Sequence, residues 1–181
     1  MTDVRTAEVL EKVVEEVPQG EDRARIETVI RSVVATFGFL SDFGYEMEEI
    51  DISSSELHKY QTSFSWCFDR ANREVSISYS PFDYEGRRCN TLHISIVKTS
   101  DADKGGKSEF EATDDYMNLR MYVESKCPDF DKRVLEVSNY EGSFAERVEK
   151  TLRAYAYYMQ DVAEDVIRGE YWESGHFHHW H

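Results

Sequence analysis

Residues 61–68 have the sequence QTSFSWCF. Large side chains alternate there with small polar ones, which is the pattern of a β-strand with one buried and one exposed face. The alternation recurs in VSISYS, residues 75–80, and in LHISIV, residues 92–97. A short turn follows the first segment, and a loop that begins at Pro81 follows the second. The three segments therefore predict an antiparallel meander.

Alternation assigns each residue of the predicted strands to one of two faces. The apolar face, expected to be buried under helices, comprises Phe64, Trp66, Phe68, Val75, Ile77, Tyr79, Leu92, Ile94 and Ile96. The opposite face comprises Ser63, Ser65, Cys67, Ser76, Ser78, Ser80, His93 and Ser95. Catalysis by a cysteine and a histidine there is the weaker hypothesis, because the pattern supplies neither a cleft nor an orienting acid. A flat, weakly charged face instead suits the docking of a helix or a partner protein.

Helical periodicity precedes the predicted sheet. Apolar residues recur every three to four positions over residues 3–17 and again from Asp22 to a C-cap at Gly44. These patterns predict two N-terminal helices. The residues that follow, from Glu46 to Ser55, have no apolar period and predict a polar connection.

Helical signals also follow the predicted sheet. Thr113 is expected to be the N-cap of a helix that ends near Lys126. Ser143 and Glu146 form a capping box, which opens a long amphipathic helix expected to end at Gly169. Residues 133–140 permit either a fourth strand or a helical turn.

Length and composition indicate one folded domain. The chain has 181 residues, of which 40% are hydrophobic, with only 9 Gly and 3 Pro. The predicted fold class is α+β: two N-terminal helices, a three- or four-stranded antiparallel meander, and C-terminal helices packed on one sheet face. We place the domain at residues 1–174 and a histidine-rich tail at residues 175–181.

The charge excludes some classes of partner. With 36 acidic and 21 basic side chains the net charge is −15, which disfavours direct binding of nucleic acid or of an anionic membrane. The sequence shows neither a signal peptide nor an apolar segment long enough to span a bilayer. Its 3 Cys are widely spaced, without a Cys-x-x-Cys pair. We therefore expect a protein of the reducing cytoplasm.

Two segments carry a resemblance to known proteins. These are the turn Leu40-Ser41-Asp42-Phe43-Gly44-Tyr45 and the end of the last predicted helix, Asp165-Val166-Ile167-Arg168-Gly169-Glu170-Tyr171. With the meander between them, the layout resembles small bacterial α+β proteins of mostly unknown function, some of which are immunity proteins that neutralise polymorphic toxins. The likeness covers roughly residues 22–171 and implies inhibition by tight binding, without catalysis.

The densest acidic run follows the second predicted helix. It contains Glu46, Glu48, Glu49 and Asp51. Acids on an exposed surface are most often ordinary solvation. The sharper hypothesis is a negative patch that steers and captures a basic protein partner. Paired carboxylates could also serve hydrolysis, but no histidine lies in a matching motif, so an enzyme ranks lower.

The tail holds the second candidate site, formed by His176, His178, His179 and His181. Neutral imidazoles at this spacing can chelate a divalent transition metal. A terminus without a fixed acidic or cysteine ligand more often binds metal only adventitiously. The nearby aromatic residues Trp172, Phe177 and Trp180 also allow the tail to pack on the domain or on a second subunit.

No catalytic signature is present, so the sequence predicts a protein that is not an enzyme. The function that it favours is an acidic protein-binding module, in its sharper form an immunity-type inhibitor of a basic toxin or nuclease. The alternative is a metal-binding or metal-dependent protein that uses the histidine-rich tail. No other cofactor is expected.

Overall fold

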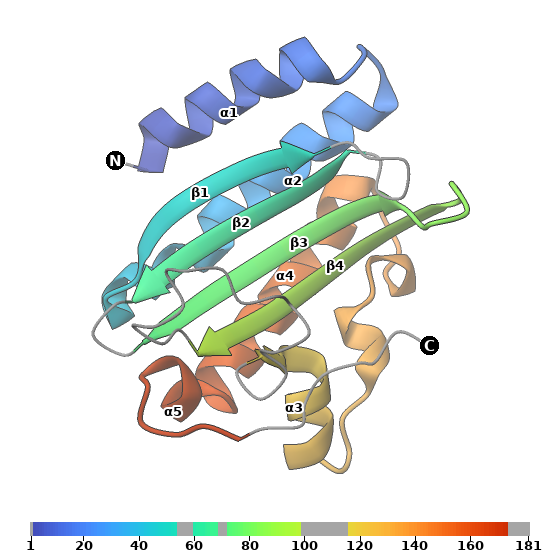
Figure 1. Ribbon diagram of the computed structural model, residues 1–181. Helices are drawn as coiled ribbons and strands as arrows, with labels where there is room; N and C mark the ends of the chain where they lie inside the picture. The colour runs from blue at the N-terminus through green and yellow to red at the C-terminus, as the bar shows by residue number, and fades with distance from the viewer. Residues whose placement is uncertain (1, 54–59, 69–71, 99–115, 174–181) are drawn as a thin grey trace.

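The computed structural model describes residues 2–53, 60–68, 72–98 and 116–173 (Figure 1). The strands are β1 (Glu46–Ser53), β2 (Gln61–Phe68), β3 (Arg73–Phe82), β4 (Arg88–Lys98) and β5 (Tyr116–Asn118). The helices are α1 (Thr2–Glu16), α2 (Glu21–Thr36), α3 (Leu119–Lys126), α4 (Phe144–Asp161) and α5 (Glu164–Ile167). Shorter 3-10 segments are η1 (Phe37–Phe43), η5 (Lys132–Leu135) and η6 (Val137–Asn139).

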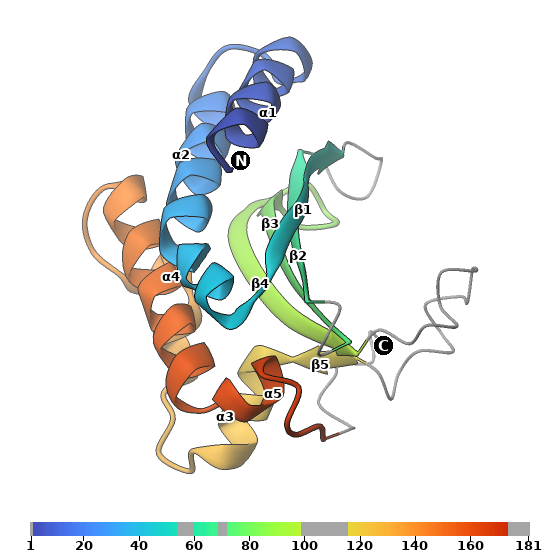
Figure 2. The same cartoon turned by 90° about the vertical axis from the view of Figure 1, so that its left-hand side faces the viewer.

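The α+β class is confirmed. Five antiparallel strands form one sheet in the order β1-β2-β3-β4-β5. The predicted strand segments pair as expected, with Phe64 opposite Ile77 and Ile77 opposite Ile94. Helices α2 and α4 lie side by side against one face of the sheet (Figure 2). The core lies between these layers, because the apolar alternation of all three strands points into it.

The acidic run is an edge strand, not the polar connection that the sequence predicted. Residues Glu46–Ser53 form β1, and only Ile50 and Ile52 are buried in the core. The strand was missed because a bulge between Met47 and Glu49 interrupts its period of two. Two buried positions are too few to stand out among four carboxylates. The sheet accordingly has one strand on each side of the predicted meander.

The fifth strand also replaces part of a predicted helix. Tyr116–Asn118 pairs with β4, and α3 begins only at Leu119. Its N-cap is Asn118, whose Oδ1 accepts a hydrogen bond from the Met121 amide at 3.2 Å. The expected cap, Thr113, lies outside the described residues. A strand of three residues is too short for its alternation to be recognised in the sequence.

Other helix ends are partly as predicted. Gly44 has a φ of 92° and ends η1, which continues α2 in a tighter turn. The capping box at Ser143 is present, but α4 ends at Asp161, and α5 follows as a separate short helix before Gly169. The sequence pattern did not reveal this break, because Ala163 and Val166 are also buried and continue the apolar period past the end of α4. In the ambiguous stretch 133–140, the structure has 3-10 turns at Lys132–Leu135 and Val137–Asn139 rather than a strand.

The end of β3 departs from the expected break at Pro81. The strand continues to Phe82 through an irregularity between Ser80 and Phe82. A proline lacks the amide hydrogen that a regular ladder needs, so it is accommodated where the pairing is interrupted.

Among the described residues, no helix is both long and apolar enough to cross a membrane.

The fold predicts that the two sheet faces contribute unequally to stability. Phe64 and Trp66 are 1% and 2% exposed, so replacing either with alanine should lower the free energy of unfolding by about 3 to 5 kcal/mol. Ser65→Ala and Ser78→Ala, on the opposite face, should change it by no more than about 0.5 kcal/mol. Urea unfolding measures both sets, and equal losses would mean that the strand register is inverted.

Candidate functional site

The sheet face turned away from α2 and α4 is lined by small polar side chains, and we call it the serine face. Cross-strand pairing arranges them in rows, with Ser63 opposite Ser78 and Ser65 opposite Ser76. The rows continue onto β4 through His93 and Ser95. None of the described helices covers these rows, and Figure 2 shows α2 and α4 together on the other side. Among the described residues, the middle of the serine face on β2 and β3 therefore carries small side chains.

The structure brings most of the predicted acidic patch to the edge of the serine face. Glu46, Glu49 and Asp51 lie opposite Cys67, Ser65 and Ser63 of β2, so they share its face. Glu48 is exposed within the bulge. The bulge shifts the strand register after Glu46 and Met47. As a result, Glu49 and Asp51 lie on the same face of the sheet as Glu46.

Asp51 forms an ion pair with a helix on the edge of the sheet. Lys12 of α1 donates a hydrogen bond to Asp51 Oδ1 at 2.6 Å. This hydrogen bond and the lysine charge lower the pKa of the Asp51 carboxyl below its ordinary value. Asp51 therefore ties α1 to the edge strand, and its role is structural at least in part.

Glu74 is a further carboxylate near this patch, and the sequence pattern did not single it out. It lies on β3 opposite Cys67 and is half-buried on the serine face. Its pKa is raised, chiefly by burial and also by the charges of Glu48 and Glu49. Extending the alternation of β3 by one step before Ser76 would have placed it. We call Glu46, Glu48, Glu49 and Glu74 the acidic rim.

The far side of the serine face carries a polar cluster. His93 Nε2 lies 2.6 Å from the hydroxyl of Tyr116, and His93 Nδ1 lies 3.4 Å from the amide nitrogen of Asn118. Tyr116 also hydrogen-bonds Ser95, while burial raises the pKa of its phenol. The cluster joins β5 to β4 across the open side of the sheet. Its hydrogen bonds link side chains of the protein to one another, as in a structural network.

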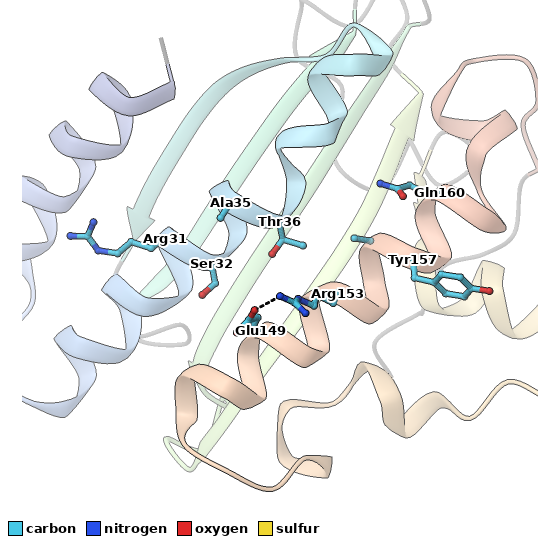
Figure 3. Close-up of a pocket in the computed structure, with 9 residues that line it drawn as sticks. Arg31, Ser32, Ala35, Thr36, Glu149, Arg153, Tyr157 and Gln160 are labelled. Atoms are coloured by element: carbon cyan, nitrogen blue, oxygen red, sulfur yellow. Dashed lines mark hydrogen bonds and ion pairs between the residues drawn. The ribbon is translucent and has the colours of Figure 1, made fainter.

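A hollow of about 610 Å³ lies on the opposite side of the molecule, between α2 and α4 (Figure 3). Arg153 is paired there with Glu149 at 2.5 Å. Arg31 extends toward α1 and Tyr157 extends away on the other side (Figure 3). The polar groups thus do not converge on a common point, as a catalytic or small-molecule site requires.

The predicted metal ligands His176, His178, His179 and His181 lie outside the described residues, so the tail hypothesis stays a prediction. Within the described part of the chain, no group of three or more His, Cys, Asp or Glu side chains is placed to hold a metal ion.

Comparison with known protein families, curated proteins and solved structures finds no match. The geometry of the serine face and the acidic rim is therefore the basis for interpreting the site.

The raised pKa of Glu74 predicts that Glu74→Gln stabilises the protein. The ionised carboxylate is disfavoured in the folded state, so at pH 7 it opposes folding. Removing its charge should raise the free energy of unfolding by about 0.5 to 1 kcal/mol. The gain should shrink as the pH falls and wild-type Glu74 takes up a proton. Urea unfolding at pH 7 and pH 4 measures the difference, with Glu8→Gln on exposed α1 as the control. A destabilised Glu74→Gln at pH 7 would contradict the electrostatic account.

Proposed function

We propose that the protein is a non-enzymatic, acidic protein-binding module that docks a basic partner on the serine face, beside the acidic rim. The observation that supports this most is the coincidence of the two features on one face. A sheet face with small side chains offers room for a partner, and carboxylates at its edge offer the charge to attract one.

Shape favours a macromolecule over a small ligand. The serine rows have short side chains on β2 and β3, and they end on β4 at the cluster of His93, Ser95 and Tyr116. A helix or strand of a partner can approach the serine face closely and form hydrogen bonds with its hydroxyl groups, whereas a small molecule is normally held in a concave pocket.

Charge favours a basic partner. The acidic rim lies on a chain of net charge −15, and repulsion from Glu48 and Glu49 adds to the effect of burial in raising the pKa of Glu74. A lysine or arginine that approaches them relieves this repulsion. Association with a cationic surface is therefore accelerated at low ionic strength.

Protection of the sheet edge is the competing explanation for the acids. Charged side chains and bulges on edge strands prevent unwanted pairing between sheets, and β1 has both. That explanation covers Glu46, Glu48 and Glu49. It does not cover Glu74, which lies on the interior strand β3. A half-buried carboxylate that opposes folding there is better explained by binding.

The finer form of the proposal is an immunity-type inhibitor of a basic toxin or nuclease, acting in the cytoplasm. An enzyme that binds nucleic acid carries a positive surface for phosphate groups. A rim of carboxylates complements such a surface and competes for it. The small polar side chains of the serine face then supply the remaining contact area.

The proposal predicts that the acidic rim controls the rate of association. We would capture a partner by pull-down from the native host and compare wild type with the triple variant Glu46→Gln, Glu48→Gln, Glu49→Gln. Asp51 is left intact because it pairs with Lys12. At low salt the variant should associate about 10-fold more slowly or worse, and the difference should shrink as salt is raised. Stopped-flow kinetics measures both.

The matched control is Glu8→Gln, Glu11→Gln, Glu15→Gln, which removes the same charge from exposed positions of α1. It should slow association far less, because these acids lie outside the rim. If both triple variants slow association equally, the association rate depends on the net charge of the protein and not on the position of the acids. A rate insensitive to both variants and to salt would remove the acidic rim from the interface.

A further inference from the structure

The outer side of the helix layer, turned away from the sheet, contains the hollow between α2 and α4. The small side chains among those that line it are Ser32, Ala35, Thr36 and Ala156. Short side chains between two helices leave a groove into which the side chains of another helix can pack. The serine face lies on the other side of the molecule (Figure 2), so the hollow is a separate surface.

A row of larger side chains runs along α4 beside the hollow. Glu149, Arg153 and Tyr157 follow one another at intervals of four residues, which places them along one ridge of the helix. The side chains of Arg153 and Glu149 are 73% and 51% exposed, and Tyr157 is 57% exposed. Figure 3 shows Glu149 and Arg153 at the hollow, near Ser32 of α2. We call Glu149, Arg153 and Tyr157 the α4 ridge.

The α4 ridge and the hollow are complementary between two copies of the chain. In a dimer with two-fold symmetry the same surface of both copies is in contact, so every contact between two residues occurs twice. A ridge and a groove that lie side by side on one face can therefore fill each other about a single two-fold axis. The charges match as well, because an antiparallel copy of α4 brings Arg153 of each chain to Glu149 of the other.

Charge limits where two copies can meet. Each chain has a net charge of −15, so two copies repel each other unless the surface of contact balances acids and bases. The charged side chains that line the hollow are Arg31, Glu149 and Arg153. This surface is therefore not acidic, and it does not attract a basic partner of the kind proposed for the serine face. A second copy of the α4 ridge, with one acid and one base, matches it.

We propose that two copies of this chain form a dimer through the outer face of α2 and α4, with the α4 ridge of each copy in the hollow of the other. The contact pairs Arg153 of each chain with Glu149 of its mate and covers the exposed ring of Tyr157. Both serine faces then point away from the two-fold axis and stay open. The dimer thus does not depend on any partner that binds to the serine face.

Stabilisation of α4 by itself is the competing explanation for part of this pattern. A glutamate and an arginine four residues apart stabilise a single helix, and Arg153 is paired with Glu149 in this way. That explanation covers neither the hollow beside the pair nor the exposed ring of Tyr157. The two explanations also differ in the oligomeric state that they predict.

The first test is the mass of the full chain in solution. Sedimentation equilibrium in about 0.15 M salt is suitable, because the screening length there is about 8 Å and long-range repulsion between the copies is weak. The mass should rise from that of one chain to that of two as the protein concentration is raised from the low micromolar to the submillimolar range. The mass of one chain at every concentration would overturn the proposal, and this result needs no variant.

The second test reverses charges on the α4 ridge. Arg153→Glu places a carboxylate against Glu149 of the other copy, twice in each dimer, and should weaken dimerisation at least about 10-fold. The double variant Glu149→Arg, Arg153→Glu exchanges the two charges, so it should dimerise as the wild type does. The matched control is Lys150→Glu, which changes the net charge by the same amount. Lys150 lies over the ring of Tyr140, 5.9 Å from its centroid, and the control should leave the dimer intact.

The variants also give results that would contradict this interface. Circular dichroism first checks that each variant is folded. Equal weakening by Arg153→Glu and Lys150→Glu would mean that the net charge controls association. A double variant that stays monomeric would exclude the pairing of Arg153 with Glu149, and a dimer unaffected by Arg153→Glu would place the interface elsewhere.

Discussion

Cross-strand contact among Phe64, Ile77 and Ile94 fixes the register of the three long strands, and the other layers of the protein depend on that register. Each residue is at most 1% exposed, and burial of such a side chain contributes about 1.5 to 3 kcal/mol. A slip of one residue would turn the apolar side chains to solvent and the serines to the core. The same pairing that builds the core therefore assembles the serine face.

The helices maintain this division because they are anchored on the apolar side. Tyr155 of α4 donates a hydrogen bond to the Leu92 carbonyl of β4 at 3.2 Å, and Tyr45 donates to the Ile167 carbonyl of α5 at 2.8 Å. Arg73, a buried cation at the start of β3, donates to the Val166 carbonyl at 3.2 Å. These bonds satisfy buried polar groups and hold α4 and α5 against the core side of the sheet.

Much of this architecture could be predicted from the sequence, because alternation in β2, β3 and β4 is long enough to detect and the capping box at Ser143 has a local signature. The two edge strands could not be predicted in this way. In β1 a bulge interrupts the period, and β5 has three residues, so tertiary pairing rather than local pattern defines both. The acids of β1 were recognised as a candidate patch, but Glu74 was not, because its environment arises from strands distant in sequence.

The core face of the sheet maintains the fold, and we propose that the serine face binds the partner. Two matched substitutions test it: Ser76→Arg, half-buried at the centre of the serine face, and Ser32→Arg, half-buried in the hollow between α2 and α4. Titration calorimetry with the captured partner should show at least about 100-fold weaker binding for Ser76→Arg, because a long cationic side chain obstructs the serine face and repels a basic protein. Ser32→Arg should leave the affinity unchanged. Unchanged binding by Ser76→Arg, with loss of binding by Ser32→Arg, would place the interface on the helices and contradict the account.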